Sequence, residues 1–323
     1  MMNRRNWITG TLMMVVTGAL GANAAWSQSF PSKPITIVVP YTAGATDREA
    51  RKLGDLAAKY IGQPIVVENR DGAGGAIGAQ YVAQSKPDGY TLLYAAPAVI
   101  TVAPLVGKPP YKYEDLMAVA RASITPHLLA ARADAPFKTL PELIAYAKAN
   151  PGKVSFGSPG NGTAVHLAGE AFADAAGIKF NHIPYRGLAP AITATMGGFV
   201  DVVIGAPGAI NVQIEAGKLR ALAQFGPTRA AALANVPTLK EQGVDLALRA
   251  DFGLFAPKGT PAAVIATIDD AFAKAVESDE FRAFVSQALV APAFLNAADY
   301  QGVVDAERAI YAKVVPKLAL GDK

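Results

Sequence analysis

Two short turns of small residues have the spacing best suited to holding a ligand. The first is Tyr41-Thr-Ala-Gly-Ala-Thr46 and the second is Gly157-Ser-Pro-Gly-Asn-Gly-Thr163. Each follows a predicted strand and opens a predicted helix, whose first amides lack an intrahelical acceptor and carry the positive end of the helix dipole. Two such turns predict an anion site without a fixed cation. Ordinary turns with Ser or Thr caps are the alternative that the sequence leaves open.

Two polar residues near these turns each admit two interpretations. His166 lies one turn into the second helix, where it either donates a hydrogen bond to a ligand or is satisfied within the core. Asp251 stands in Arg249-Ala-Asp-Phe252, before an apolar segment, and either pairs with Arg249 or faces the ligand. Thr46 or Asp47 is expected to cap the first helix.

Ser158 raises the question of a hydrolase. A nucleophile elbow has the pattern G-x-S-x-G. This chain has Phe156 at the first required glycine, and the hydrolase order Ser, acid, His needs a late histidine, whereas His182 is the last in the chain. Other triad orders exist in principle, and an exported hydrolase therefore stays as the less favoured alternative.

Nucleotide and metal sites are not predicted. Glycines at positions 72, 74, 75 and 78 do not match G-x-G-x-x-G, and Gly72–Gly78 is interpreted as close helix–strand packing. His127, His166 and His182 show no paired ligand spacing, and the chain contains no cysteine. No cofactor is expected, and disulfides are excluded.

The order of elements predicts an α/β protein with two lobes. Ile35–Val39 is a continuous β-branched run, typical of a buried strand, and strands alternate with helices from there to about Ala95. A second series runs from Leu140 to Phe225, and helices dominate the tail. Ligands of such sheets bind beyond the carboxyl ends of the strands, where both turns lie.

The N-terminus predicts export. Arg4 and Arg5 precede an apolar stretch, and Ala22-Asn-Ala24 has the form of a cleavage site, so residues 1–24 are interpreted as a signal peptide cleaved near Ala24 and the protein as periplasmic. The net charge of +4 falls to +2 when the two arginines of this segment are subtracted. No basic block or basic-aromatic stripe occurs, so nucleic acid binding is not expected.

The ordered motifs resemble those of the periplasmic solute-binding proteins of tripartite tricarboxylate transporters, the Bug family. The similarity covers nearly the whole chain after the signal. The matching segments are Lys33-Pro-Ile35 to Gly44, Val67-Glu-Asn-Arg70 with Gly72-Ala-Gly-Gly75, Lys86-Pro-Asp-Gly-Tyr-Thr-Leu-Leu93, Phe156 to Thr163 with His166-Leu-Ala168, Ile183-Pro-Tyr-Arg-Gly187, Leu219-Arg-Ala-Leu-Ala223, Val236-Pro-Thr238 and Phe255-Ala-Pro-Lys-Gly-Thr-Pro261.

The resemblance implies a two-lobed periplasmic-binding-protein (Venus flytrap, type II) fold, each lobe a mostly parallel sheet flanked by helices. Lobe 1 is expected at 29–125 plus 250–323 and lobe 2 at 126–249. The two turns would grip one carboxylate, and the Ala95–Pro97 and Gly205–Pro207 turns would complete the wall. The expected ligand-binding residues are Tyr41, Thr42, Ala43, Ala45, Thr46, Asp47, Ala96, Ser158, Asn161, Gly162, Thr163, His166, Pro207 and Asp251.

Three positions depart from the family pattern. Ala45 replaces a second glycine, Asp251-Phe252 replaces an aromatic pair, and Phe225 stands where a threonine is common. A phenyl ring near the pocket would favour a flat or aromatic acid. Plain core packing of Phe225 is the alternative.

The sequence therefore predicts a monomeric, non-enzymatic binding protein for a small organic carboxylate, such as a dicarboxylate, tricarboxylate or aromatic acid. The resemblance implies integral-membrane transporter subunits as partners. The alternative partner is a receptor to which the ligand-bound protein would bind. Affinity in the micromolar range, about −8 kcal/mol, is expected for such a protein.

Overall fold

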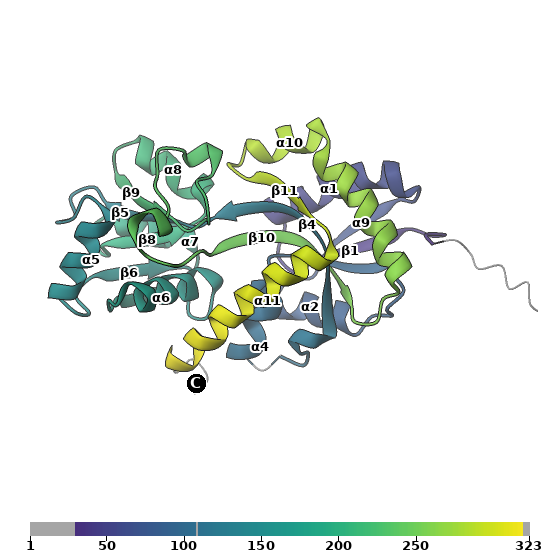
Figure 1. Cartoon of the computed structure of the whole chain (residues 1–323), viewed down its shortest axis with the longest axis horizontal. Helices are drawn as coiled ribbons and strands as arrows, with labels where there is room; N and C mark the ends of the chain where they lie inside the picture. The colour runs from purple at the N-terminus through teal and green to yellow at the C-terminus, as the bar shows by residue number, and fades with distance from the viewer. Residues whose placement is uncertain (1–29, 108, 319–323) are drawn as a thin grey trace, which may run out of the picture.

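The computed structural model describes residues 30–107 and 109–318. It has two α/β lobes joined by long strands (Figure 1). The predicted signal peptide lies outside the described residues. Within those residues, no helix has both the length and the apolar character to cross a membrane.

The sheet of the first lobe has six strands in the order β11-β4-β10-β3-β1-β2. Ile35, Ile37, Val38 and Val39 are fully buried, as expected for a β-branched run covered on both faces. The strands are β1 (Ile35–Val39), β2 (Ile65–Asn69), β3 (Thr91–Ala95), β4 (Leu116–Pro126), β10 (Arg249–Pro257) and β11 (Ala291–Leu295).

Helices cover both faces of this sheet. Leu53, Leu56 and Ile61 of α1 pack into one apolar cluster with residues of α9, whereas α2, α3 and α11 contribute to another. The helices are α1 (Ala45–Ile61), α2 (Ala76–Ala83), α3 (Ala98–Thr101), α4 (Ala103–Val106), α9 (Ala262–Glu277), α10 (Asp279–Ser286) and α11 (Ala297–Val314), with 3-10 turns η1 (Ala73–Gly75), η2 (Tyr113–Asp115) and η5 (Val315–Leu318).

The predicted cap of α1 is wrong. The N-cap residue is Gly44, whose extended backbone precedes Ala45, and no side chain caps the helix. Glycine suits this position because no side chain then covers the first amides of the helix. The interpretation of the glycine segment is confirmed: a Cβ on Gly78 would lie 2.8 Å from Pro40 Cβ and 2.8 Å from the Arg70 carbonyl oxygen.

The second lobe has a five-stranded sheet in the order β7-β6-β8-β5-β9. Phe156, Phe172 and Phe225 lie in its main core with no exposed surface. Its elements are β5 (Leu128–Arg132), α5 (Leu140–Ala149), β6 (Ser155–Ser158), α6 (Ala164–Ala176), β7 (Asn181–Pro184), α7 (Leu188–Met196), β8 (Val202–Gly205), α8 (Pro207–Glu215), β9 (Leu219–Gln224), η3 (Ala231–Leu233) and η4 (Lys240–Gln242).

The two-lobed α/β prediction is confirmed, but the sheets are mixed and not mostly parallel. β1 pairs in parallel with β2 and β3, whereas β4, β10 and β11 pair antiparallel to their neighbours. In the second sheet β5 is antiparallel to β8 and β9. The physical reason is the connection: β4 leaves the first lobe and β10 returns to it, so the two strands run in opposite directions side by side.

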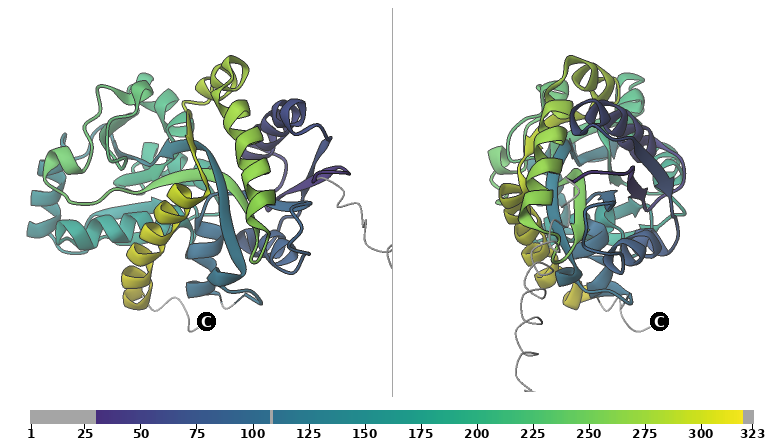
Figure 2. Two further views of the ribbon diagram at one scale, coloured as in Figure 1. Left: turned by 45° about the vertical axis from the view of Figure 1, so that its right-hand side comes forward. Right: turned by 90° about the vertical axis from the view of Figure 1, so that its right-hand side faces the viewer.

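Helix α11 spans both lobes. Tyr300 and Val304 pack in the first lobe, while Tyr311 and Val314 join the core of the second. The views of Figure 2 show this helix (yellow) beside β4 and reaching toward the second lobe. Any movement of one lobe against the other must therefore accommodate this helix as well as the two strands.

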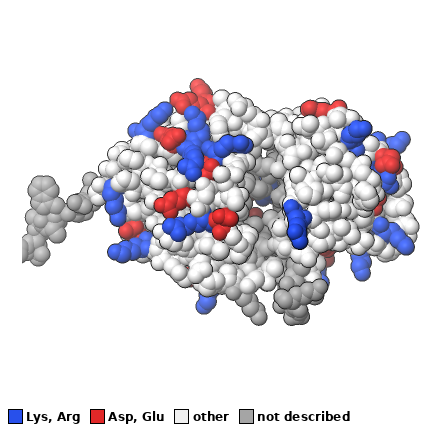
Figure 3. All heavy atoms as spheres, turned by 180° about the vertical axis from the view of Figure 1, so that it is seen from behind, with Lys and Arg blue, Asp and Glu red and all other residues white. Residues whose placement is uncertain are grey.

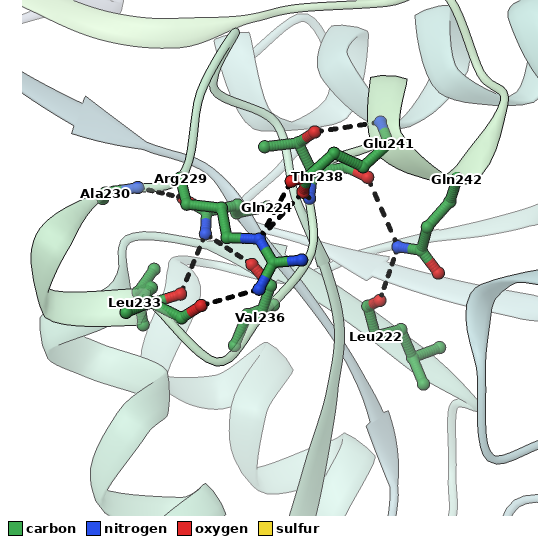
Figure 4. A network of polar contacts seen from close by, with 10 residues as sticks. Leu222, Gln224, Arg229, Ala230, Leu233, Val236, Thr238, Glu241 and Gln242 are labelled. Atoms are coloured by element: carbon green, nitrogen blue, oxygen red, sulfur yellow. Dashed lines mark hydrogen bonds and ion pairs between the residues drawn. The ribbon is translucent and has the colours of Figure 1, made fainter.

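A buried amide fixes the long segment after β9 (Figure 4). Gln224 has no exposed surface, and its Nε2 donates to the carbonyls of Leu233 (3.0 Å) and Val236 (2.7 Å). Its Oε1 accepts from the amide of Ala230 at 2.8 Å. One side chain thus satisfies three backbone groups of a segment that has little regular structure.

We expect Gln224→Leu to lower the free energy of unfolding by about 3 kcal/mol, because three buried backbone groups would lose their partner. Urea unfolding followed by circular dichroism measures this change. Gln287→Leu, which alters an exposed glutamine at the end of α10, is the matched control and should change stability by less than about 0.5 kcal/mol. If Gln224→Leu and Gln287→Leu had the same free energy of unfolding, the stabilising role of the Gln224 amide would be contradicted.

Candidate functional site

A cavity with a volume of about 630 Å³ lies between the two lobes. Tyr41, Ala96 and the helices α2 to α4 line it from the first lobe, and residues 161–164 line it from the second. Figure 3 shows a hollow between the lobes on the face opposite α11. Of the predicted site residues, the structure brings together Tyr41, Ala96, Asn161, Gly162 and Thr163 at this cavity.

The second turn presents the start of α6 to the cavity. Thr163 is the N-cap residue, and its Oγ1 accepts from the amide of His166 at 3.3 Å and donates to the Gly160 carbonyl at 2.9 Å. The first intrahelical bond runs from the Leu167 amide to the Thr163 carbonyl. The amides of Ala164 and Val165 therefore precede the regular helical bonds and are available to an anion.

Two histidines and a serine brace this turn from inside the lobe. His166 Nδ1 accepts from the Gly162 amide at 3.1 Å, and its ring stacks on His182 with centroids 3.8 Å apart. Ser158 Oγ lies 2.6 Å from His182 Nε2 and accepts from the Gly160 amide at 3.1 Å. Ser158 and His166 are buried and do not line the cavity, and in this structure their side chains brace the turn.

Both rings are neutral at physiological pH. Burial lowers the pKa of His166 to about 4, with a further contribution from the adjacent His182, and burial lowers the pKa of His182 to about 4. Glu170 Oε1 lies 3.7 Å from His166 Nε2, outside hydrogen-bond distance. Since His166 accepts a backbone hydrogen bond through Nδ1, protonation of that atom would remove the bond.

Gly162 fits the tip of this turn for two reasons. Its φ of +72° is unfavourable for residues with a side chain, and a Cβ there would lie 3.0 Å from Val106 Cγ1 of α4. The turn of the second lobe thus already approaches the first lobe closely at one side of the cavity.

The first turn is braced differently. Asn69 Nδ2 donates to the Tyr41 carbonyl at 3.0 Å, and Arg51 joins Asn69 to Asp47 through bonds of 3.1 and 2.9 Å. The side-chain bond from Arg51 holds the pKa of Asp47 below its usual value. Asp47 is therefore occupied by this pair. In this turn Thr42, Ala43, Gly44 and Ala45 are exposed, and Thr46 is half-buried. None of these residues lines the cavity.

The remaining predicted residues lie elsewhere. Asp251 is buried, with Arg121 Nη1 and Arg249 Nε at 2.7 and 2.9 Å from Oδ1, so the pairing interpretation holds and includes a second arginine. Phe225 belongs to the core, where its ring contacts His127 and Phe172 edge-on, and it is not a stacking surface for a ligand. Pro207 is buried at the first turn of α8, away from the main cavity.

Sequence reasoning missed most of the cavity wall. Its first-lobe side includes Ala73, Ile77 and Gln80 from the glycine segment and α2, and from the following stretch Val99, Val102, Ala103, Val106, Gly107, Pro109 and Pro110. Thr101 Oγ1 anchors this wall by donating to Glu307 of α11 at 2.8 Å, and burial raises the pKa of that carboxyl to about 8. The sequence does contain a signal for this wall. It is the mainly apolar stretch from Pro97 to Pro110, which contains four prolines and directly follows the end of a strand.

Ser158 and His182 are within hydrogen-bond distance, as in a nucleophile–base pair. Ser158 has no exposed surface, however, and among the described residues no carboxylate is hydrogen-bonded to the second nitrogen of His182. Nor does any group of three potential metal ligands occur in the described part of the chain. The arrangement thus stabilises a turn, and its polar surface toward the cavity is made of amides and the Asn161 side chain.

The lobes and the cavity between them define a two-lobed periplasmic binding protein. A solute-binding protein from Polaromonas solved without ligand is 33% identical, with a TM-score of 0.81 over 89% of this chain and 99% of that one. The model of the tripartite tricarboxylate transporter family receptor, TctC, matches residues 49–320. The chain belongs to this family.

Relatives and ligand-bound structures agree with this assignment. The UPF0065 protein in the gbd 5′ region of Cupriavidus necator is 40% identical over 97% of this chain and 98% of its own length. An R. palustris protein solved with adipate is 30% identical (TM-score 0.73, 89% of this chain and 97% of that one). MatC from Rhodopseudomonas palustris, with bound malate, is 28% identical (TM-score 0.71, 88% and 100%).

The histidine brace predicts a specific pH dependence. Because the pKa of His166 is about 4 in the folded protein and about 6.5 in an unfolded chain, the unfolded state takes up a proton first as the pH falls. The stability that this ring contributes is present above pH 6.5 and is lost between pH 6.5 and about 4.

His166→Asn keeps an acceptor for the Gly162 amide without a titrating ring. We expect the stability difference between wild type and this variant to shrink by about 1 kcal/mol from pH 7.5 to pH 5, allowing for solvent screening. Urea unfolding at the two pH values measures it. A difference that is the same at both pH values would contradict a neutral, buried His166.

Proposed function

We propose that this protein captures a small organic carboxylate in the cavity between its lobes and delivers it to integral-membrane transporter subunits. The observation that carries the proposal is the start of α6, which directs unpaired amides into a cavity that Tyr41 closes from the other lobe. Such amides bind an anion without a fixed cation. The ligands of two solved relatives, adipate and malate, are carboxylates and support the same chemistry.

Binding would use backbone and side-chain donors of the second lobe. Tyr41 lines the cavity from the first lobe, and burial among residues of that lobe raises the pKa of its hydroxyl. Asn161 is exposed at the cavity, and its side chain makes no hydrogen bond to another described residue. Charge-assisted hydrogen bonds from such groups replace the water contacts that the ligand loses.

The start of α1, which no side chain caps, is the second part of the proposed site. Its exposed turn, Thr42 to Ala45, lies outside the cavity in the described structure, so it would reach the ligand only when the lobes close. Ligand contacts to both lobes would then stabilise the closed form. The lobes in this proposal are 29–125 with 250–323 and 126–249, and β4 and β10 cross between them.

The proposal places the protein in the periplasm as a monomer without catalytic activity. The predicted signal at residues 1–24 supports export, and the similar structure from Polaromonas is that of a solute-binding protein. The proposed partners are a carboxylate ligand and the membrane subunits of a tripartite transporter.

Asn161→Asp tests the site by placing a negative charge at the start of α6. We expect affinity for the carboxylate to fall at least tenfold, because the two negative charges repel, while thermal stability is kept since an acidic group suits a helix N-terminus. Isothermal titration calorimetry with a ligand found by a thermal-shift screen measures the affinity.

Asn235→Asp is the matched control, since it adds the same charge to the same lobe at an exposed position outside the cavity. Its affinity should equal that of the wild type. Unchanged affinity in Asn161→Asp, with the control also unchanged, would rule out this site.

A further inference from the structure

We propose that the site prefers a monocarboxylate with an apolar body over dicarboxylates and tricarboxylates of the same length. This inference rests on the proposed function, and it names the class of acid that the same cavity takes. Its basis is the distribution of polar and apolar groups around the cavity.

Polar groups are concentrated at one end. They are the start of α6 and the side chain of Asn161, both from the second lobe. Thr163 contributes little, because its hydroxyl already accepts from the His166 amide and donates to the Gly160 carbonyl. This end therefore has donors for a single carboxylate.

The opposite wall is apolar. Ile77 of α2 lines it with 52% of its surface exposed, which is unusual for a large aliphatic side chain. Val99, Val102 and Val106 of α3 and α4 continue the surface toward Pro109. Covering such a surface with the hydrocarbon part of a ligand removes apolar area from water, and this favours binding.

No charged side chain occurs among the described residues that line the cavity. Gln80 is the one polar side chain on the α2 wall. In the first lobe, Arg51 pairs with Asp47 and donates to Asn69, and Arg70 pairs with Glu68 and stacks on the Tyr81 ring. A second carboxylate against this wall would lose its hydration without gaining a cation, which is strongly unfavourable.

The size of the cavity fits this class. A volume of about 630 Å³ lies within the range of small-molecule sites, roughly 300–1,000 Å³. It holds a six-carbon chain or a single ring attached to the carboxylate. Hexanoate and adipate then form a matched pair, equal in chain length and different by one carboxylate.

Isothermal titration calorimetry of the purified protein with hexanoate and adipate, and with benzoate and terephthalate, tests the inference. We expect each monocarboxylate to bind at least tenfold tighter than its dicarboxylate partner, a difference of about 1.4 kcal/mol. Tighter binding of adipate and terephthalate would overturn the inference and leave the proposed function intact. Binding of none of these acids, nor of malate, would overturn both.

Gln80→Arg supplies the missing cation and should reverse the order, raising adipate affinity at least tenfold and lowering that of hexanoate. Gln84→Arg makes the same change at the exposed end of α2, outside the cavity, and should leave the ratio unchanged. If Gln80→Arg and Gln84→Arg had the same ratio of adipate affinity to hexanoate affinity, the placement of Gln80 in the apolar wall of the ligand site would be contradicted.

Lys108 follows Gly107 in the chain and lies outside the described residues. The same titrations with Lys108→Gln therefore complete the test. An unchanged preference for hexanoate supports the inference. A wild-type preference for adipate that this variant abolishes would overturn it, because the site would then contain its own cation.

Discussion

The site depends on unpaired backbone amides at the start of α6, held in place without a neighbouring charge. Gly162 and Thr163 form the turn, and the neutral rings of His166 and His182 support it from within the lobe. A charged brace would alter the potential at the helix start. Because burial keeps both rings neutral, the proposed anion site would rely on the helix dipole and the local donors.

The connection between the lobes sets how the site can change shape. Asp251 pairs with Arg121 and Arg249, so residues of β4 and β10 are joined at the crossing by a buried ion-pair network. Burying these charges costs little free energy only while each of them stays paired. Together with α11, which packs into both cores, this favours bending of the connecting strands over their sliding past each other.

Much of the fold followed from local patterns, and the rest did not for physical reasons. The strand Ile35–Val39 was predicted correctly because a β-branched run is a local signal. The antiparallel pairing of β4 with β10 joins Arg249 to Pro126 and Pro257 to Leu116, residues far apart in the chain, which no local pattern reveals. Phe225 and Asp251 were ambiguous because burial and pairing depend on distant partners. The cavity wall at α2 to α4 was missed because its apolar residues resemble ordinary core.

The central claim is that a carboxylate binds at the first amides of α6. Backbone amide chemical shifts during titration with hexanoate test it most directly. The account predicts large, saturable downfield shifts at Ala164 and Val165, with the amides of α5 in the same lobe unaffected. Saturable binding of the acid with no shift at these two amides would contradict it.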